Sequence, residues 1–396
     1  MLRVINFIAA LLIAAAAGGS PAPTQAFESP APAGSFAPHL TRAGDGSVLL
    51  SWIEKLTPEK HRVRAARLRD GAWEPAITIV EDAQLFANWA DVPSVSAQDG
   101  LLFAHWLEKS GKGTYAYHVK LRVSSDNGRT WSAPSTAHSD RSETEHGFVS
   151  FFARPDGTPG LAWLDGRETG GGHSGHGGGA MTLRAAAAGP NGTTDEVLLD
   201  GRVCDCCPTA AISTPDAAIV AYRDRSSSEV RDISVVRYAR GAWSKPVTMK
   251  DGWQIGGCPV NGPALAASGR RVALAWFTAA NNKPAVKLAH SKDSGATWST
   301  AAVLSSGVPL GRVAAAITSD GATHVAWLDH NDGNGRLLIR RIAADGAMSA
   351  PQTLTPMKTD RNSGYPRMIA DGKSVIYAWT EVGAGRVTKV RVGRRN

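Results

Sequence analysis

One sequence feature recurs seven times and restricts the fold more than any other. An aromatic residue followed two positions later by a carboxylate closes an apolar run in six places, and in the seventh Thr278 replaces the acid. Consecutive aromatics are 54, 57, 59, 54, 51 and 52 residues apart. The copies are Trp52/Glu54, Trp106/Glu108, Trp163/Asp165, Tyr222/Asp224, Trp276/Thr278, Trp327/Asp329 and Trp379/Glu381.

The stretch from Val92 to Ala137 shows what one repeat contains. Four short runs of alternating apolar residues are separated by turns, with Asp99-Gly100 between the first two. This pattern predicts a four-stranded antiparallel unit. A period of about 50 residues with four strands indicates a β-propeller. We therefore predict an all-β propeller with seven four-stranded blades. Six blades are the alternative count, and a β-sandwich is the alternative fold.

The two ends of the chain suggest export and ring closure. Residues 1–26 have the features of a signal peptide: Arg3, an apolar segment over residues 4–17, and small residues before Phe27. Residues 27–34 are a Pro- and Ala-rich lead-in, and residues 35–394 form a single propeller domain. The seventh repeat supplies three strands, so the segment after the signal is a candidate for the fourth. We expect a periplasmic or secreted protein with no transmembrane segment after signal cleavage.

Charge favours small anionic ligands over nucleic acid. The formal net charge is +8 and is dispersed along the chain. No Lys/Arg stripe with interleaved aromatics is present, which argues against a nucleic-acid partner. We expect a carbohydrate or another small anionic ligand.

Two loops carry the motif Ser-x-Asp-x-Gly-x-Thr-Trp, centred on Asp126 and Asp293. The carboxylate of such a motif accepts backbone hydrogen bonds in a tight turn, so its role is structural. The motif resembles the Asp-box of the sialidase superfamily, also called the BNR repeat. The resemblance covers nearly all of the chain after the signal. It implies a propeller whose Asp-boxes lie on the face away from the active site.

The resemblance also implies a set of catalytic positions. Sialidases bind the sugar carboxylate with three arginines, and a tyrosine activated by a glutamate is the nucleophile. Here Tyr365 is the candidate nucleophile, with Glu381 or Asp224 as its activator, and Arg312 and Arg367 as the clamp. The first-blade arginine is missing from Phe36-Ala37-Pro38. The protein is therefore a sialidase-like glycoside hydrolase if it is active, and we expect weak or no sialidase turnover.

Charged residues gather where the first strand of each repeat starts and the second ends. The acids of the aromatic-acid pairs form one ring there, either as Arg-paired strand ends or as a polar funnel for acid/base chemistry. The loop 223–232 is dense in charges of alternating sign, which suits an ion-pair network or recognition of anionic oxygens. The ligand-binding candidates are Asp165, Arg167, Arg223, Arg225, Arg312 and Arg367.

All four cysteines fall at the same face. Cys204, Cys206 and Cys207 precede the fourth repeat, and Cys258 begins the fifth. Disulfides are one interpretation, although a pair within residues 204–207 closes a very small ring. A copper or zinc site is the other interpretation, with further ligands from the Gly-rich tract 170–181 and its surroundings. Those further candidates are His146, His173, His176 and Met181. The second functional hypothesis is accordingly a metal-binding or redox propeller.

Overall fold

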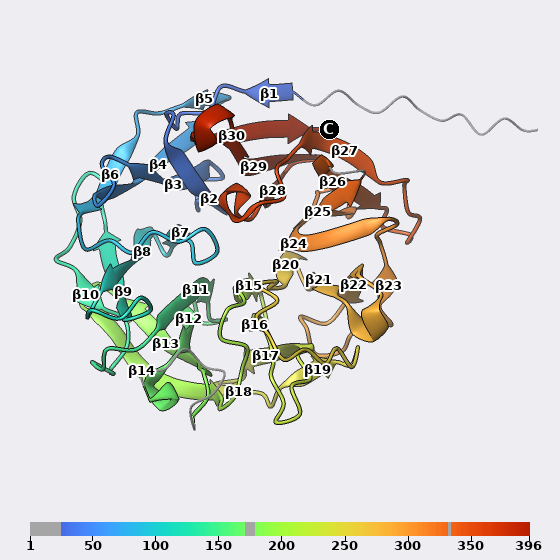
Figure 1. The fold of residues 1–396 in the computed structure, drawn as a ribbon, viewed down its shortest axis with the longest axis horizontal. Coiled ribbons are helices and arrows are strands. Elements are labelled where there is room, and N and C mark those ends of the chain that lie inside the picture. Colours follow the sequence, from blue (N-terminus) through green and yellow to red (C-terminus); the bar gives the residue numbers. More distant parts are fainter. Residues whose placement is uncertain (1–24, 171–178, 332–333) are drawn as a thin grey trace, which may run out of the picture.

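Seven antiparallel sheets surround a central axis in the part of the chain that the structure describes (Figure 1). The structure is a computed structural model and describes residues 25–170, 179–331 and 334–396. We number the sheets as blades 1 to 7 along the chain. In blades 1 to 6 the strand that comes first in the chain lies nearest the axis, and the following strands lie further out. In blade 7 the order from the axis outward is β28, β29, β30 and then β1 from the N-terminal end. The seven-bladed propeller of four-stranded units is confirmed.

Blades 1 to 4 follow the repeat with two additions. Blade 1 contains β2 (Ser35–Arg42), β3 (Val48–Lys55), β4 (His61–Arg69), β5 (Ala72–Trp73) and β6 (Ile77–Asp82). Blade 2 contains β7 (Ser94–Gln98), β8 (Leu101–Lys109), β9 (Tyr117–Ser124) and β10 (Ser135–Thr136). Blade 3 contains β11 (His146–Ala153), β12 (Pro159–Asp165), β13 (Thr182–Gly189) and β14 (Gly192–Asp200). Blade 4 contains β15 (Ala210–Thr214), β16 (Ala217–Arg223), β17 (Ile233–Ala239), β18 (Ala242–Trp243) and β19 (Val247–Met249).

Blades 5 to 7 complete the ring. Blade 5 contains β20 (Ala264–Ser268), β21 (Arg271–Thr278), β22 (Ala285–Ser291) and β23 (Ala302–Val303). Blade 6 contains β24 (Val308–Ile317), β25 (Thr323–Asn331), β26 (Asn334–Ile342) and β27 (Gln352–Pro356). Blade 7 contains β28 (Arg367–Asp371), β29 (Ser374–Val382), β30 (Thr388–Arg395) and β1 (Gln25–Phe27).

Among the described residues, helix is confined to short turns. The described residues include the 3-10 helices η1 (Arg167–Thr169), η2 (Ala280–Asn282), η3 (Arg361–Ser363) and η4 (Ala384–Arg386). Among the described residues, no helix is long and apolar enough to cross a membrane.

The N-terminal segment closes the ring by supplying the outer strand of blade 7. Strand β1 pairs antiparallel with β30, in the register Gln25↔Arg394 to Phe27↔Val392. The strand ends before Pro30, so the prolines that weaken this segment as a strand lie outside the pairing. The expected signal cleavage after Ala26 falls within β1. That cleavage stays a prediction.

The repeated aromatic fills the interface between its own blade and the preceding one. Trp106 of blade 2 packs with Leu49 and Ile53 of blade 1, and Trp52 of blade 1 packs with Ile376 of blade 7. The clusters at the other interfaces place Trp163, Tyr222, Trp276, Trp327 and Trp379 in the same way. Burying one such ring removes 150–250 Å² from water, which is about 4–6 kcal/mol of transfer free energy.

The repeated acid accepts the indole N–H of the repeated tryptophan in blades 1 and 3. The indole N–H of Trp52 donates to Glu54 at 2.8 Å, and that of Trp163 donates to Asp165 at 2.8 Å. In blade 5, where Thr278 replaces the acid, Trp276 donates instead to Asp251 Oδ2 at 2.6 Å. Asp251 follows β19 of blade 4, so the neighbouring blade supplies the missing carboxylate. A carboxylate therefore holds the interface tryptophan in blades 1, 3 and 5, whereas the indole nitrogens of Trp106 and Trp327 have no hydrogen-bond partner among the described residues.

Candidate functional site

The two faces of the propeller have different roles. Ser294, in the Asp-box loop of blade 5, donates to Asp216 in the turn after β15 at 3.1 Å. Arg67 contacts Asp45, in the turn after β2, and Asn127, in the Asp-box loop of blade 2. The Asp-boxes therefore share a face with these turns, and the starts of the inner strands lie at the opposite face.

Both Asp-boxes have the expected hydrogen bonds. Asp126 Oδ1 accepts the Thr130 N–H at 2.8 Å, and its Oδ2 accepts the Thr130 hydroxyl at 2.6 Å. Asp293 binds Thr297 in the same way, at 2.9 and 2.6 Å. The threonine hydroxyls and N–H groups lower the pKa of each carboxyl to about 2. These residues order their turns.

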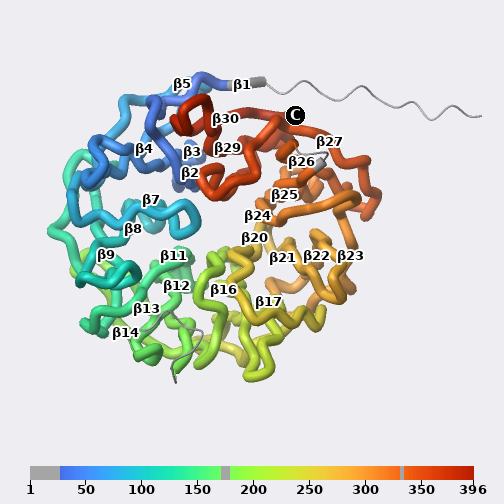
Figure 2. Tube along the Cα trace, in the orientation of Figure 1, coloured from blue at the N-terminus to red at the C-terminus, as the bar shows by residue number. Residues whose placement is uncertain are grey.

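A cavity of about 760 Å³ follows the propeller axis, and inner-strand residues of all seven blades line it. The Cα trace shows the inner strands arranged around this axis (Figure 2). Small residues keep it open. Alanines from β7, β15, β20, β24 and β28 contribute much of the wall. Pro208, Pro263 and Tyr365 line its strand-start end.

Arg367 is a cation without an acidic partner in this cavity. Its side chain lines the wall, and no carboxylate of the described residues lies within 4.0 Å of it. Its buried Nε atom has no hydrogen-bond partner. Burial lowers the pKa of Arg367, while the nearby Tyr365 opposes this shift. Burial, and then the charge of Arg367, hold the pKa of His39 well below its usual value, so His39 is neutral beside this cation.

Trp89 lies next to the strand-start end of the cavity. Its ring stacks on Tyr365 with a centroid separation of 6.1 Å, and the Arg312 guanidinium lies 4.8 Å from the Trp89 ring. Trp89 belongs to the connection between blades 1 and 2, whereas Arg312 and Tyr365 belong to blades 6 and 7. This connection reaches across the face, and the half-buried indole becomes part of the candidate site.

The inner strands begin with an unusual backbone. Ala37, Phe148, Val260 and Arg312 all have positive φ, between 45° and 54°. Three of these coincide with register shifts at the starts of β2, β11 and β24. Positive φ is costly for a β-branched residue such as Val260, and strain of this kind often marks binding sites.

The other predicted arginines are occupied by the protein itself. Arg312 donates to the carbonyls of Asp360 and Gly364 at 3.0 and 3.1 Å. Arg223 is 1% exposed and donates to three carbonyls, those of Asn261, Arg231 and Phe277, at 2.6–2.8 Å. It also lies over the ring of Trp253.

The loop after β16 is an ion-pair network. Arg225 Nη2 lies 2.8 Å from Glu229, which also binds Arg231 at 2.7 Å. In blade 3, Arg167 pairs with Asp165 at 2.7 Å and with Glu196 at 2.7 Å. Burial would raise the pKa of Asp165, but the Arg167 hydrogen bond and the charge of His146 outweigh it and hold the pKa at about 2.

The structure does not bring the predicted catalytic residues into hydrogen-bond contact. The Tyr365 hydroxyl donates to the Val260 carbonyl, and burial raises the Tyr365 pKa. Glu381 is exposed and pairs with Arg391 at 2.6 Å. Asp224 accepts the Ser234 hydroxyl at 2.9 Å, and its pKa is raised by burial and by Asp200. Their catalytic roles stay predictions.

A tyrosine–glutamate pair that sequence reasoning missed lies under the same face. The Tyr117 hydroxyl donates to Glu145 Oε1 at 2.7 Å, and Asp91 lies nearby. Burial, with a smaller contribution from Glu145, raises the pKa of Asp91 well above its usual value. Tyr117 is 0% exposed beneath Phe86, so this pair is inaccessible to a substrate.

The four cysteines converge between blades 4 and 5. Cys204, Cys206 and Cys207 are buried, whereas Cys258 is exposed, and none forms a disulfide in the structure. The Cys204 sulfur lies 3.7 Å from that of Cys206 and 3.2 Å from that of Cys207. Burial would raise the pKa of Cys204, but its hydrogen bonds with the other two thiols hold it well below its usual value.

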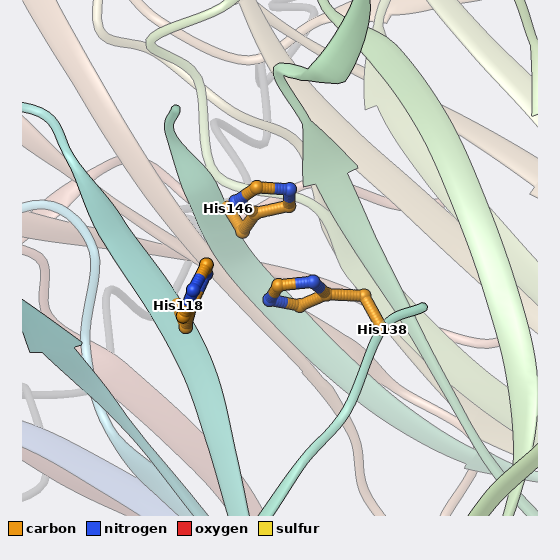
Figure 3. Close-up of side chains that lie close together, drawn as sticks. All are labelled: His118, His138 and His146. Atoms are coloured by element: carbon orange, nitrogen blue, oxygen red, sulfur yellow. The ribbon is translucent and has the colours of Figure 1, made fainter. Parts of the chain in front are cut away.

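The additional metal-ligand candidates lie elsewhere. His146 stacks on His138 at 3.8 Å and lies 5.5 Å from His118, ring centroid to ring centroid, between blades 2 and 3 (Figure 3). Met181 is buried among apolar residues between blades 3 and 4. His173 and His176 lie outside the described residues.

Hydrogen bonds within the protein occupy most of the ring nitrogens in the histidine cluster. His138 Nε2 accepts the Val119 N–H at 3.2 Å, and Nδ1 faces the Asp140 carbonyl at 2.8 Å. His146 Nε2 faces the Asp140 carboxylate at 2.9 Å. Because both nitrogens of His138 are engaged, this cluster could hold a metal only by breaking backbone hydrogen bonds.

Two residues of the site and one of the blade 4–5 interface gave no sequence signal. Trp89 belongs to no repeat, Asn261 is an ordinary polar residue after Val260, and the interface residue Asp251 lies in a linker. Asn261 links blades 5 and 6, because its Oδ1 accepts the Arg312 N–H at 2.8 Å. A departure from the repeat is the one sequence signal available for Asp251. Because Thr278 replaces the acid in blade 5, a carboxylate from elsewhere could be expected to bind Trp276.

Three solved structures with a similar fold are described as an ulvan lyase, a sialidase and an α-L-arabinofuranosidase. An ulvan lyase of polysaccharide lyase family PL25 has a TM-score of 0.58 and 12% identity, over 92% of this chain and 95% of that one. A Hadza microbial sialidase has a TM-score of 0.50 and 15% identity, over 84% and 73%. An α-L-arabinofuranosidase from Fusarium graminearum has a TM-score of 0.50 and 12% identity, over 91% and 92%. At these identities the likeness shows the fold alone.

Sequence comparison gives the family. No curated protein sequence matches the chain significantly. The family model described as a BNR repeat-like domain matches residues 60–374. Because this match covers more than half of the chain, the protein belongs to the BNR repeat-like family, and the predicted membership of the sialidase superfamily is confirmed.

Proposed function

We propose that this protein binds an anionic carbohydrate at the strand-start end of its axial cavity. Arg367 recognises a carboxylate or sulfate of the sugar, and Trp89, which stacks on the cavity-lining Tyr365, offers an aromatic surface at the same end. The bound sugar is the ligand of the propeller, whether or not a bond is then broken.

The observation that carries this proposal is the unpaired guanidinium of Arg367. An arginine fork matches two oxygens of a carboxylate or sulfate, and the interaction is strong where water is excluded. The remaining predicted arginines already bind carboxylates or carbonyls of the protein. Arg367 is half-buried, and a partly desolvated cation without an anionic partner is less stable than a paired one, so a ligand anion would stabilise it.

The comparisons support a sugar as the ligand class. The descriptions of three similar folds name a sialidase, an arabinofuranosidase and an ulvan lyase. An ulvan lyase structure with a TM-score of 0.55 is described as bound to -[GlcA(1-4)Rha3S]-, a repeat that carries a carboxylate and a sulfate. We transfer only the ligand class, an anionic glycan, to this chain.

Binding is favoured over sialidase chemistry by the state of the tyrosines. The hydroxyl of Tyr365 donates to a backbone carbonyl, and Tyr117 is fully buried. The first-blade position that holds an arginine in sialidases contains Phe36-Ala37-Pro38. In the part of the chain that the structure describes, no carboxylate hydrogen-bonds to Tyr365, so no adjacent base is in place to deprotonate it during attack.

Export is part of the proposal. The apolar segment 4–17, preceded by Arg3, supports a periplasmic or secreted location. An exported propeller would meet polysaccharides outside the cytoplasm. Amino-terminal sequencing of protein from the periplasm or medium tests this point, and an intact Met1 end contradicts it.

The direct test compares charged and neutral oligosaccharides by isothermal titration calorimetry. A sulfated or uronate-containing tetrasaccharide should bind, and a neutral one of equal length should not. Arg367→Met should weaken binding about 10- to 100-fold, because a charged hydrogen bond contributes about 1.5–3 kcal/mol. The matched control is Arg391→Met, an exposed arginine paired with Glu381. Equal binding of neutral glycans, or an unchanged affinity in Arg367→Met, contradicts the proposal.

A further inference from the structure

Three buried sulfurs lie on one tight turn before blade 4. The ligand atoms of Cys204, Cys206 and Cys207 are all within 4.8 Å of one another. Cys258, at the start of blade 5, approaches this group from the other side, within 4.8 Å of Cys206 and of Asp205. Four sulfurs in one place exceed what packing requires, because a small apolar residue would fill the same volume.

The spacing of the sulfurs fits a common metal ion. A metal–sulfur bond of about 2.3 Å separates two sulfurs by about 3.8 Å in tetrahedral geometry and by about 4.0 Å in trigonal geometry. The Cys204–Cys206 distance is 3.7 Å, and the Cys204–Cys207 distance is 3.2 Å. An outward movement of less than about 1 Å therefore suffices for all three to bind one ion.

The sulfurs of Cys204 and Cys207 accept hydrogen bonds from nitrogen donors. Arg231 Nη1 donates to Cys204 Sγ at 3.4 Å, and the Asn261 N–H donates to Cys207 Sγ at 3.3 Å. Donors aimed at sulfur stabilise a thiolate, and such outer contacts orient the ligands of metal sites. A disulfide sulfur is a much weaker acceptor, so the contacts favour thiolates over a staple.

The charges around the turn favour anionic sulfur. Arg231 lies 3.6 Å from Asp205 and 2.7 Å from Glu229, and Glu229 also binds Arg225. These carboxylates balance two of the three nearby guanidiniums. The third belongs to Arg223, which has only carbonyl and aromatic partners among the described residues. Arg223 therefore places beside the turn a positive charge that pairs with no carboxylate of the described residues.

The backbone holds the sulfurs in place before any ion binds. The Cys204 N–H donates to the Arg223 carbonyl at 3.0 Å, which ties the turn to the end of β16. Gly262 packs so closely on Pro208 that a side chain there would collide with the Pro208 carbonyl. Val260, next to the cysteines, is held at a φ of 45°. A prearranged turn loses little entropy when it binds an ion.

We infer that Cys204, Cys206 and Cys207 form a three-sulfur site for a soft d¹⁰ cation, with copper(I) as its occupant. Soft thiolates select copper(I) and zinc. Zinc prefers four ligands. As the side chains lie, Cys258 is near Cys206 and does not join all three sulfurs in one group, so three-coordinate copper(I) fits better. Binding releases the protons of the thiols to solvent, and neither metal nor sulfur changes oxidation state.

The test uses the full-length, reduced protein under anaerobic conditions. Titration with copper(I) in competition with a chromophoric copper(I) chelator should give one ion per chain. Cys207→Ser should weaken binding about 100-fold or more. Cys258→Ser is the matched control and should stay within about threefold of the wild type. Thermal unfolding of each apo variant checks that it is folded.

A second measurement needs no variant. Copper-edge X-ray absorption of the loaded wild type should show sulfur neighbours alone, and thiol titration of the unfolded apo protein should find four thiols. Two disulfides that persist after gentle reduction overturn the inference, as does copper(I) binding that Cys207→Ser leaves unchanged. Tight zinc binding that Cys258→Ser abolishes overturns the three-coordinate copper site in favour of a tetrahedral one.

Discussion

Replacing Asp251 by alanine should loosen the interface between blades 4 and 5. Asp251 follows β19 and accepts the indole N–H of Trp276 at 2.6 Å. It also pairs with Lys287 at 2.5 Å, with only 6% of its side chain exposed. Trp276 is 1% exposed, so loss of the carboxylate leaves a buried N–H without an acceptor.

The expected loss in the free energy of unfolding follows from these two contacts of Asp251. A hydrogen bond to a charged group contributes about 1.5–3 kcal/mol. The pair with Lys287, whose side chain is 24% exposed, adds at most about 1 kcal/mol after solvent screening. We expect a loss of about 2–4 kcal/mol. In a propeller of this size that corresponds to a fall in Tm of a few degrees, because Tm responds less in larger domains.

The repeat itself provides the rescue. Thr278 occupies the position at which Glu54 and Asp165 bind the tryptophan of their own blades. Thr278→Asp should therefore recover part of the stability lost in Asp251→Ala. In the wild-type background it should destabilise, because it places a second carboxylate beside Asp251. Tm from calorimetry on all four proteins completes the double-mutant cycle. Equal effects of Thr278→Asp in both backgrounds, or a Tm of Asp251→Ala within 1 °C of wild type, would refute the reasoning.

Three further outcomes are expected. The pKa values of Asp126 and Asp293 are lowered to about 2 from 3.8, so the two ionised carboxylates stabilise the fold above about pH 4, and this contribution is lost as the pH falls towards 2. Tm measured against pH should show this loss in the wild type and not in the variant with alanine at both positions. Arg223→Met should lower the Tm more than Arg223→Lys, because three carbonyls lose their donor, and an equal Tm for both would contradict the fork geometry. Turnover of a fluorogenic sialoside should be at background for the wild type and for Tyr365→Phe, and robust activity that disappears in the variant would restore the sialidase mechanism.

The propeller could be predicted because its determinants are local and repeated. Each blade needs an aromatic at one place in its second strand, and seven copies fix the phase even where one copy loses its acid. The closing strand was harder to predict. Whether residues 25–27 pair with β30 depends on the geometry of the completed ring, which the segment itself does not encode.

The candidate site could be predicted only in part, because its residues are distinguished by partners from other blades. Arg223 and Arg367 look alike in the sequence, since each lies near the end or start of a strand. The carbonyls of Arg231, Asn261 and Phe277 occupy Arg223. In contrast, no carboxylate of the described residues pairs with Arg367, and the acid in the cavity wall, Asp99, lies in the turn after β7 at the other end of the inner strands. The convergence of the cysteines followed from the adjacency of blades 4 and 5. The roles of Arg231 and Asn261 beside them required the folded loops.

The proposed sugar site and the proposed metal site meet at Val260 without sharing a ligand. The Val260 carbonyl accepts the Tyr365 hydroxyl, which lines the sugar cavity, while its side chain packs on the cysteines. An ion bound to the three sulfurs would fix the segment 258–261 and therefore the position of Tyr365 and the stacked Trp89. The recognising groups differ, a guanidinium in one site and thiolates in the other. Loss of copper binding therefore leaves Arg367 able to hold an anion, and each proposal stands or fails on its own measurement.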